Sequence, residues 1–267
     1  MSDFEITRRR YAAIGFAQEL GALAMRYYLN RESLAVSMKG AQDFLTVADG
    51  AVEQRFREMI ADAFPGDGVV GEEAGGANAE NLWIIDPIDG TSNFARDNPH
   101  WCVSIGFLRR GVPEAGVIFA PVMNELYEAQ RGQGARRNGK TIHPSGETDI
   151  GRATIEIGWS SRRPHEDYIG LARATFEAGA QAKRSASGAL GVCYAADGRT
   201  DGYMELHINA WDVAAGVIIA REAGAAVSNF FSGDALTTGN PILVATPALA
   251  PRLAAMMGLE AGELLTG

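Results

Sequence analysis

The sequence has few cysteines and few histidines. Cys102 and Cys193 are the only cysteines among 267 residues, and both lie in apolar surroundings. Two such cysteines supply neither a disulfide framework nor a zinc-binding quartet, so we expect a reducing compartment. The four histidines follow no metal-ligand spacing, and we assign them no role.

Long hydrophobic runs are also absent. No apolar run approaches the length of a membrane span, and no hydrophobic signal region follows the charged N-terminal residues. We therefore expect a cytoplasmic protein with no membrane partner.

The chain lacks an excess of basic residues. Lys and Arg number 24 against 33 Asp and Glu, which gives a net charge of −9. Nucleic acid is bound through clustered Lys and Arg, so we expect no nucleic-acid partner. A small phosphorylated substrate remains compatible with this charge, because bound divalent cations reverse the local field. The 46% hydrophobic and 21% charged fractions are typical of a folded globular protein.

Patterns of apolar residues predict helices and strands in mixed order along the chain. Helices are predicted at Ile6–Leu29, Asp49–Phe64, Pro164–Ala178, Ser185–Ala196, Trp211–Ala223 and from Pro247 onward. Strands are predicted at Leu82–Ile85, Trp101–Leu108, Glu114–Ala120, Glu125–Gln130, Ala153–Gly158, Met204–Leu206, Ala225–Asn229 and Ile242–Ala245. Asn138-Gly139 predicts a hairpin turn. The mixed order indicates two closely packed α/β layers divided near residue 147.

Two aspartates follow the short apolar run that ends at Ile85. Asp86 and Asp89 are three residues apart, and in an extended or turn conformation both carboxylates can reach neighbouring Mg²⁺ ions. The carbonyl of Ile88 is a further oxygen ligand in the same turn. Gly90 allows close approach of a ligand to the backbone, and a helix beginning at Thr91 would leave N–H groups for a phosphate oxygen. The stretch therefore predicts a metal-bound phosphate site.

Two other interpretations of this stretch compete. An Asp-Gly pair after a strand is often only a solvated turn. The motif Asp-x-Asp-Gly-Thr of aspartyl-phosphate enzymes would place the nucleophile at position 87, which is Pro87 and has no nucleophilic atom. The sequence therefore argues against a phosphoaspartate mechanism.

Four separated motifs together resemble the inositol monophosphatase family of metal-dependent, lithium-sensitive phosphatases. They are, in chain order, Asp43–Asp49, Gly71-Glu72-Glu73, Trp83–Phe94, and Trp211–Gly216 with its continuation Glu222-Ala223-Gly224. The resemblance implies a layered αβαβα sandwich of the sugar-phosphatase superfamily, with α+β and α/β subdomains at residues 1–147 and 148–267. It also implies a homodimer.

The resemblance assigns roles to particular residues. Two or three Mg²⁺ ions, with Mn²⁺ as a substitute, would be held by Glu72, Asp86, the Ile88 carbonyl, Asp89 and Asp212. Thr91 and Asp49, together with Glu72, would activate the attacking water. Substrate would be bound by Gly90, Thr91, Asp89, Glu205 and Gly188. Lys39 matches a lysine of the N-terminal loop, Val36–Gln42, which influences the third metal.

Several of these residues also have purely structural explanations. Glu72 belongs to an acidic loop pair, Asp212 begins a predicted helix where the macrodipole favours Asp, and Asp49 could be an N-cap. The segment Ser185–Ala189 departs from the Gly-Ser/Thr-Ala that many family members carry, which puts sugar contacts there in question.

The expected activity is hydrolysis of a small polyol monophosphate, first of all inositol 1-phosphate, by direct in-line attack of water. Glu205 favours a polyol. Histidinol phosphate, fructose 1,6-bisphosphate and phosphoadenosine phosphate are the alternative substrates. A regulatory protein that keeps the fold but works by binding a partner is the alternative outside enzymes.

Overall fold

A seven-stranded sheet occupies the N-terminal half of the chain. The computed structural model describes residues 2–30, 36–40, 43–76, 79–260 and 264–266. The sheet follows chain order: β3 (Gly68–Gly71), β4 (Asn81–Asp89), β5 (Cys102–Arg109), β6 (Val112–Ala120), β7 (Glu125–Gln130), β8 (Ala135–Arg137) and β9 (Lys140–Thr141). Only the β3–β4 pair is parallel.

A six-stranded sheet belongs to the C-terminal half. Its order is β11 (Gln181–Lys183), β10 (Thr154–Ile157), β12 (Gly202–Ile208), β14 (Asn240–Ala245), β13 (Ala226–Ser228) and β15 (Leu264–Thr266). Strand β10 is parallel to both neighbours, and the remaining pairs are antiparallel. A separate antiparallel pair is formed by β1 (Val36–Gly40) and β2 (Asp43–Thr46).

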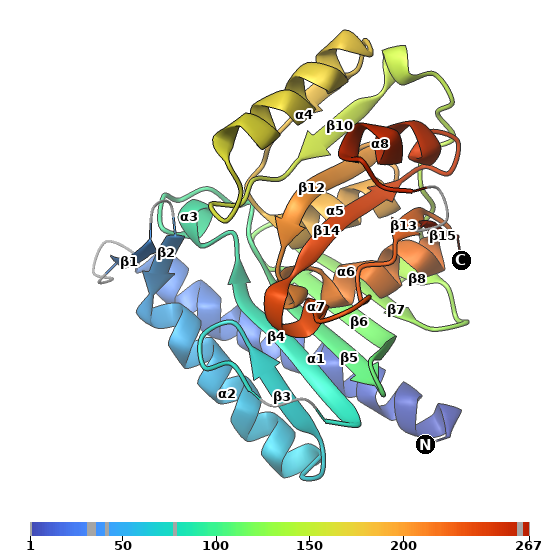
Figure 1. The fold of residues 1–267 in the computed structure, drawn as a ribbon. Helices are drawn as coiled ribbons and strands as arrows, with labels where there is room; N and C mark the ends of the chain where they lie inside the picture. The colour runs from blue at the N-terminus through green and yellow to red at the C-terminus, as the bar shows by residue number, and fades with distance from the viewer. Residues whose placement is uncertain (1, 31–35, 41–42, 77–78, 261–263, 267) are drawn as a thin grey trace.

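Helices form three layers around and between the two sheets (Figure 1). Helices α1 (Asp3–Leu29) and α2 (Val47–Ala63) cover one face of the seven-stranded sheet. Helices α5 (Gly188–Ala196) and α6 (Ala210–Ala223) lie between the sheets, and α4 (His165–Glu177) and α8 (Ala250–Met257) cover the far face of the six-stranded sheet. Two short helices are α3 (Thr91–Phe94) and α7 (Ala235–Thr238). The order of layers is the αβαβα sandwich that the family resemblance implies.

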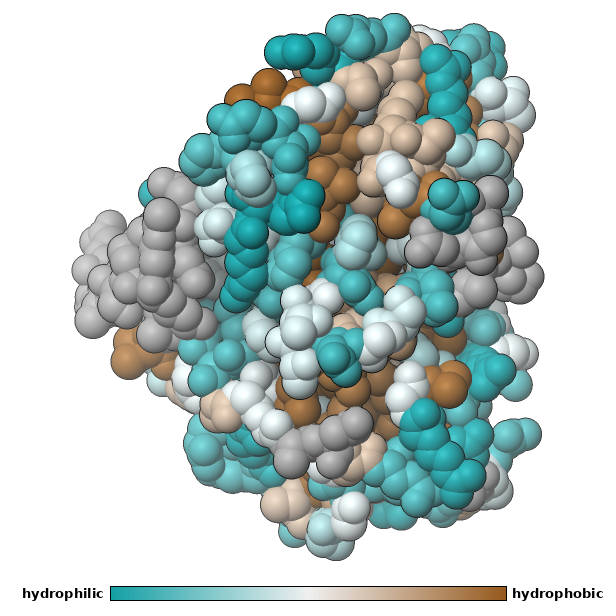
Figure 2. All heavy atoms as spheres, in the orientation of Figure 1, coloured by the Kyte–Doolittle hydropathy of each residue, from teal (hydrophilic) through white to brown (hydrophobic). Residues whose placement is uncertain are grey.

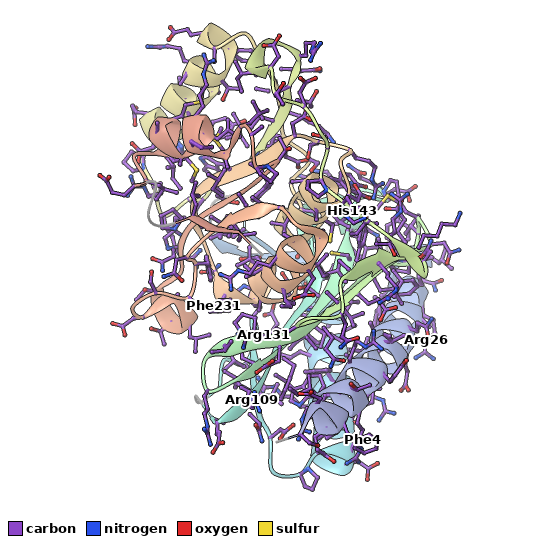
Figure 3. The ribbon with its side chains drawn as sticks, turned by 90° about the vertical axis from the view of Figure 1, so that its right-hand side faces the viewer. Phe4, Arg26, Arg109, Arg131, His143 and Phe231 are labelled. Carbon is purple, nitrogen blue, oxygen red and sulfur yellow. The ribbon has the colours of Figure 1, made fainter. Side chains whose placement is uncertain are left out.

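Glycines allow the central helix α6 to approach the seven-stranded sheet closely. A Cβ atom on Gly106 would lie 2.8 Å from the Cβ of Ala214, and one on Gly116 would lie 2.5 Å from the carbonyl oxygen of Ala215. On the opposite face, α1 runs along the sheet, with Phe4 near one end and Arg26 near the other (Figure 3).

Most predicted elements match the structure; the ends of helices and strands differ by a few residues, and short strands such as β11 and β15 were not predicted. The strand predicted at Glu125–Gln130 is β7 with the same bounds, and the Asn138-Gly139 turn joins β8 to β9 with positive φ at both residues, as predicted. The strand predicted at Leu82–Ile85 is longer, because β4 continues through Asp89. In the Val36–Gln42 loop, residues 36–40 form strand β1, while residues 41 and 42 and the side chain of Lys39 lie outside the described residues.

The surface seen in Figure 2 is mostly hydrophilic, with hydrophobic atoms gathered in a strip between α4 and α8. Within the described part of the chain, every helix is too short or too polar to cross a bilayer.

Candidate metal centre and substrate cavity

Strand β4 delivers two buried carboxylates to one place. Side chains alternate between the faces of a regular strand, so residues three apart would point to opposite faces. Here the β4–β5 register shifts between Asp86 and Asp89, and this irregularity allows both carboxylates to approach one point. Asp86 is 1% exposed and Asp89 is 6% exposed, which excludes the competing interpretation of a solvated Asp-Gly turn.

The third carboxylate comes from the start of α6. Asp212 is the third residue of this helix, and its Oδ2 accepts a hydrogen bond from the backbone N–H of Asn209 at 3.0 Å. Asp212 therefore has the structural role expected of an aspartate in a capping position. It also contributes to a site, because one oxygen each from Asp86, Asp89 and Asp212 lie within 4.8 Å of one another.

The three aspartates share an unfavourable electrostatic environment. Burial raises the pKa of Asp86 well above its usual range, and the charges of Glu72 and Asp89 raise it further. The pKa of Asp212 is also raised well above its usual range, mainly by burial and next by the charge of Asp89. The pKa of Asp89 is also raised by burial, against hydrogen bonds from Ser187 and neighbouring N–H groups that lower it. Carboxylates buried together must take up protons or a cation.

The chemistry of the donor set fits a hard divalent cation. The cluster offers carboxylate oxygens, and the Ile88 carbonyl lies in the same turn of the chain. Mg²⁺ and Mn²⁺ prefer such oxygen ligands, whereas Zn²⁺ sites usually include nitrogen or sulfur ligands beside any carboxylate. Glu72 is half-buried and lines the adjoining cavity, and its charge acts on Asp86 and Asp212. Glu72 thus lies on the cavity side of the three aspartates and is not one of the group whose oxygens lie within 4.8 Å of one another.

Thr91 and Asp49 meet beside this cluster. The Thr91 Oγ1 lies 3.3 Å from Asp49 Oδ1 and 3.0 Å from the Ile88 carbonyl oxygen. Asp49 is 1% exposed and lies inside the first turn of α2, which begins at Val47, so it is not the N-cap. Gly90 precedes α3 with φ of 93°, and a Cβ there would lie 2.9 Å from the carbonyl oxygen of His100. A side chain at Gly90 would therefore disrupt the turn that presents Thr91.

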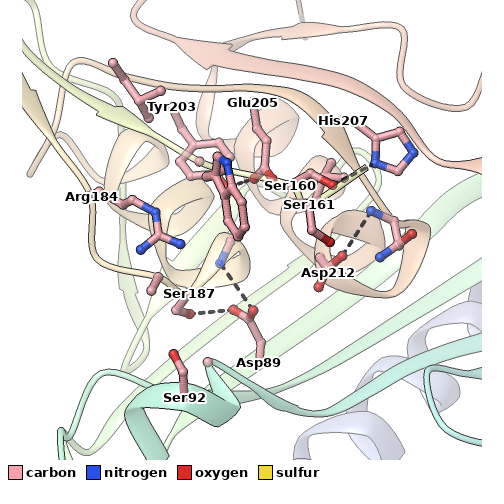
Figure 4. A pocket seen from close by; sticks show the side chains of 18 of the residues that line it. Asp89, Ser92, Ser160, Ser161, Arg184, Ser187, Tyr203, Glu205, His207 and Asp212 are labelled. Carbon is pink, nitrogen blue, oxygen red and sulfur yellow. Dashed lines mark hydrogen bonds between the residues drawn. The ribbon is translucent and has the colours of Figure 1, made fainter. Parts of the chain in front are cut away.

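A cavity of about 360 Å³ opens beside the carboxylates (Figure 4). One wall comes from the N-terminal half and includes Glu72, Asp89, Gly90 and Thr91. The other comes from the C-terminal half, with Glu156, Arg184, Gly188, Tyr203, Glu205 and Asp212 among its residues. The sequence-predicted substrate residues thus meet around one space.

Glu205 lies at the part of this cavity formed by β12. It is 6% exposed, and its Oε2 accepts a hydrogen bond from the Tyr203 hydroxyl at 2.5 Å. Burial raises the pKa of Glu205 to about 7, although the Tyr203 hydrogen bond lowers it. A buried carboxylate in a cavity wall is suited to accept hydrogen bonds from substrate hydroxyl groups.

Some cavity residues were not predicted from the sequence. Ser187 caps α5 and its hydroxyl donates a hydrogen bond to Asp89 Oδ2 at 2.5 Å, while the N–H of Gly188 donates to Asp89 Oδ1 at 3.2 Å. A serine before an apolar helix signals an N-cap, but nothing local signals a partner 98 residues away. Arg184 and Glu156 also line the cavity without having been expected there.

Comparison with known proteins agrees with this geometry. The model of the inositol monophosphatase family matches residues 6–258. Nus factor SuhB of Escherichia coli strain K12 is 34% identical over 259 residues, which cover 95% of this chain and 97% of that protein. Nus factor SuhB of Vibrio cholerae is 37% identical over 241 residues, covering 88% and 90%.

Solved structures give the same result. The extragenic suppressor protein suhB of Bartonella henselae superimposes with a TM-score of 0.86 at 29% identity, covering 92% of this chain and 97% of that one. The inositol monophosphatase of Anabaena has a TM-score of 0.82 at 31% identity, covering 96% and 98%. With the family model matching most of its length, the chain belongs to the inositol monophosphatase family.

Proposed function

We propose that the protein is a Mg²⁺-dependent phosphatase that hydrolyses a small polyol monophosphate, with inositol 1-phosphate as the first candidate. The observation that carries the proposal is the cluster of Asp86, Asp89 and Asp212, one oxygen of each lying within 4.8 Å of the others, with Asp89 and Asp212 in the wall of the cavity. Membership of a family of metal-dependent phosphatases supports the same chemistry.

The chain's own residues divide into three tasks. Two or three ions, Mg²⁺ or in its place Mn²⁺, would be held by Glu72, Asp86, the Ile88 carbonyl, Asp89 and Asp212. When bound, the ions supply positive charge to the phosphoryl group and lower the pKa of water. The Thr91 hydroxyl and Asp49, which are 3.3 Å apart, would orient the attacking water and accept its proton. Glu72 would hold the same water.

The remaining residues would bind the substrate. The backbone N–H groups of Gly90 and Thr91 would hold the phosphate, beside Asp89 and Gly188 in the same cavity. Glu205 would accept a hydrogen bond from a hydroxyl of the leaving alcohol, which gives the preference for a polyol. Attack by water would be in line with the leaving oxygen, with no covalent enzyme intermediate.

Phosphate release by the purified protein tests this function. The panel is inositol 1-phosphate, histidinol phosphate, fructose 1,6-bisphosphate and phosphoadenosine phosphate, each assayed with Mg²⁺, with EDTA and with added lithium. We expect turnover to be fastest with inositol 1-phosphate, to need Mg²⁺ and to be inhibited by lithium. Full turnover in EDTA would contradict the metal mechanism, and a preference for another member of the panel would reassign the substrate.

A matched pair of variants tests the site itself. Asp212→Asn should abolish turnover, whereas Asp62→Asn, on the exposed face of α2, should leave it unchanged. Normal Mg²⁺-dependent activity of Asp212→Asn would refute the ligand assignment.

A binding function is the second candidate, because the curated relatives are named Nus factors. We keep the homodimer, the cytoplasmic location and the absence of a nucleic-acid partner as proposals. Light scattering of the purified protein tests the dimer. A mobility-shift assay with RNA or DNA tests the absence of a nucleic-acid partner. Retention of nucleic acid together with no turnover on any substrate would favour the binding function.

A further inference from the structure

Asp89 differs from the other two clustered aspartates in the origin of its hydrogen-bond donors. Asp86 accepts from the N–H of Ile88 in its own strand, and Asp212 accepts from the N–H of Asn209 at its own helix start. Asp89 instead accepts from a segment about 100 residues further along the chain: Ser187 Oγ at 2.5 Å, the Ala189 N–H at 2.8 Å and the Gly188 N–H at 3.2 Å.

These donors divide unequally between the two oxygens of Asp89. Oδ2 receives the Ser187 hydroxyl and the Ala189 N–H, and the Cys102 thiol lies 3.8 Å away. Oδ1 receives only the longer bond from Gly188. The Ser187 bond, the shortest of the three, therefore acts with the Ala189 N–H to fix the rotation of the carboxylate, and Oδ1 is left with more capacity for a cation.

The segment that carries Ser187 is itself held from two other elements. On β10, the buried Glu156 accepts hydrogen bonds from both the N–H and the hydroxyl of Ser185. On α3, the side-chain amide of Asn93 donates to the carbonyls of Ser185 at 2.9 Å and Ala186 at 3.3 Å. These contacts maintain Ala186 at φ of 62°, a left-handed conformation that is unfavourable for alanine.

The Ser187 hydroxyl is therefore placed before any cation binds. It is 3% exposed, and the backbone on its N-terminal side is fixed by the contacts of Ser185 and Ala186. On its C-terminal side it caps α5, so its position is also set by the helix. Figure 4 shows the Ser187 side chain directed at Asp89, with the hydrogen bond between them drawn as a dashed line.

We propose that Ser187 is a positioning residue of the metal site, which sets the affinity of the protein for its divalent cation by orienting Asp89. This rests on the proposed function, in which Asp89 is a metal ligand. Loss of a group that orients a metal ligand typically costs about 10- to 100-fold in metal affinity, and we expect this loss for Ser187→Ala. Because the site can still fill at high Mg²⁺, kcat at saturating Mg²⁺ should change much less than the half-saturating Mg²⁺ concentration.

Titration calorimetry with Mg²⁺ and with Mn²⁺ on the full chain tests the proposal independently of turnover. Ser185→Ala is the matched control, because it removes a hydroxyl that contacts Glu156 and not Asp89. The N–H of Ser185 and the amide of Asn93 still hold the segment in this variant. Ser2→Ala is a second control, since Ser2 also caps a helix but is exposed and distant from the cluster. We expect both control variants to bind each cation with an affinity within about threefold of the wild type, well short of the loss expected for Ser187→Ala.

Three outcomes decide the matter. Weakened binding in Ser187→Ala alone, with unfolding temperatures in EDTA close to that of the wild type, supports the proposal. Unchanged binding in Ser187→Ala, or an equal loss in Ser185→Ala, overturns it while leaving the metal site intact. A wild-type chain that binds neither cation overturns both this inference and the proposed function.

Discussion

The two aspartates Asp89 and Asp212 should respond differently to the same substitution in the absence of metal. Each belongs to the cluster whose oxygens lie within 4.8 Å, so each carries repulsion that an asparagine would remove. At an effective dielectric constant of about 20, two unit charges at that separation repel by roughly 3.5 kcal/mol. Protonation already relieves part of this, because burial raises the pKa values of both groups and neighbouring charges raise that of Asp212 further.

For Asp212→Asn, the relief should appear as added stability. The amide oxygen of asparagine can still accept the hydrogen bond from the N–H of Asn209, so little is lost. We expect the free energy of unfolding in EDTA to rise by about 1 to 3 kcal/mol, which corresponds to several degrees in melting temperature.

For Asp89→Asn, the stability gained by removing the charge repulsion should be offset by lost hydrogen bonds. Its two oxygens accept hydrogen bonds from Ser187, Gly188 and Ala189, and an amide NH₂ would face some of these donors. Each hydrogen bond to a charged group contributes about 1.5 to 3 kcal/mol, so losing one or two offsets the gain. We expect a melting temperature in EDTA equal to or below that of the wild type.

Thermal unfolding in EDTA and in Mg²⁺ measures this contrast, with Asp62→Asn as the exposed control. Mg²⁺ should raise the melting temperature of the wild type and of Asp62→Asn, and should have little effect on either site variant, because ligand binding stabilises only the state that binds. Asp212→Asn melting at or below the wild type in EDTA, or below Asp89→Asn, would refute the reasoning.

Three further predictions concern the cavity and the core. Burial raises the pKa of Glu205 from 4.5 to about 7, so its contribution to stability is present at acid pH and lost as pH rises through 7. In urea unfolding with EDTA, the free energy of unfolding of Glu205→Gln should rise relative to that of the wild type by up to about 3 kcal/mol between about pH 5 and pH 8. A difference in free energy between the two proteins that does not change with pH would contradict this. Ala186→Gly should raise the urea midpoint, because φ of 62° costs alanine roughly 1 kcal/mol; a lower midpoint would show that the strain is absent. Gly106→Ala should lower the free energy of unfolding by about 1 to 3 kcal/mol, since the new Cβ would lie 2.8 Å from that of Ala214. Gly170→Ala, with open space around it, is its control, and equal effects of the two would contradict the packing argument.

Much of the fold could be predicted because the responsible signals are local. The bounds of β7 and the turn between β8 and β9 follow from residues adjacent in the chain: alternating side chains in one case and Asn138-Gly139 in the other. Elements without a strong local signal, such as the three-residue strands β11 and β15, were not predicted. They form because a neighbouring strand offers hydrogen bonds, which the local sequence does not reveal.

The candidate site shows the same division. The sequence indicated Asp86 and Asp89 through the run of two aspartates followed by Gly90-Thr91, and it indicated Asp212 through the resemblance to the inositol monophosphatase family. It did not indicate that β4 runs through both of its aspartates, since a register irregularity depends on the partner strand β5.

The sequence by itself thus determined which side chains can hold a cation, and the tertiary structure decided how they are held. Ser187 meets Asp89 only because helix α5 is packed between the two sheets, which brings residues 98 positions apart into hydrogen-bond contact. Periodicity and turn chemistry act between near neighbours in the chain, whereas the orientation of a buried carboxylate depends on donors that only the packing of distant segments supplies.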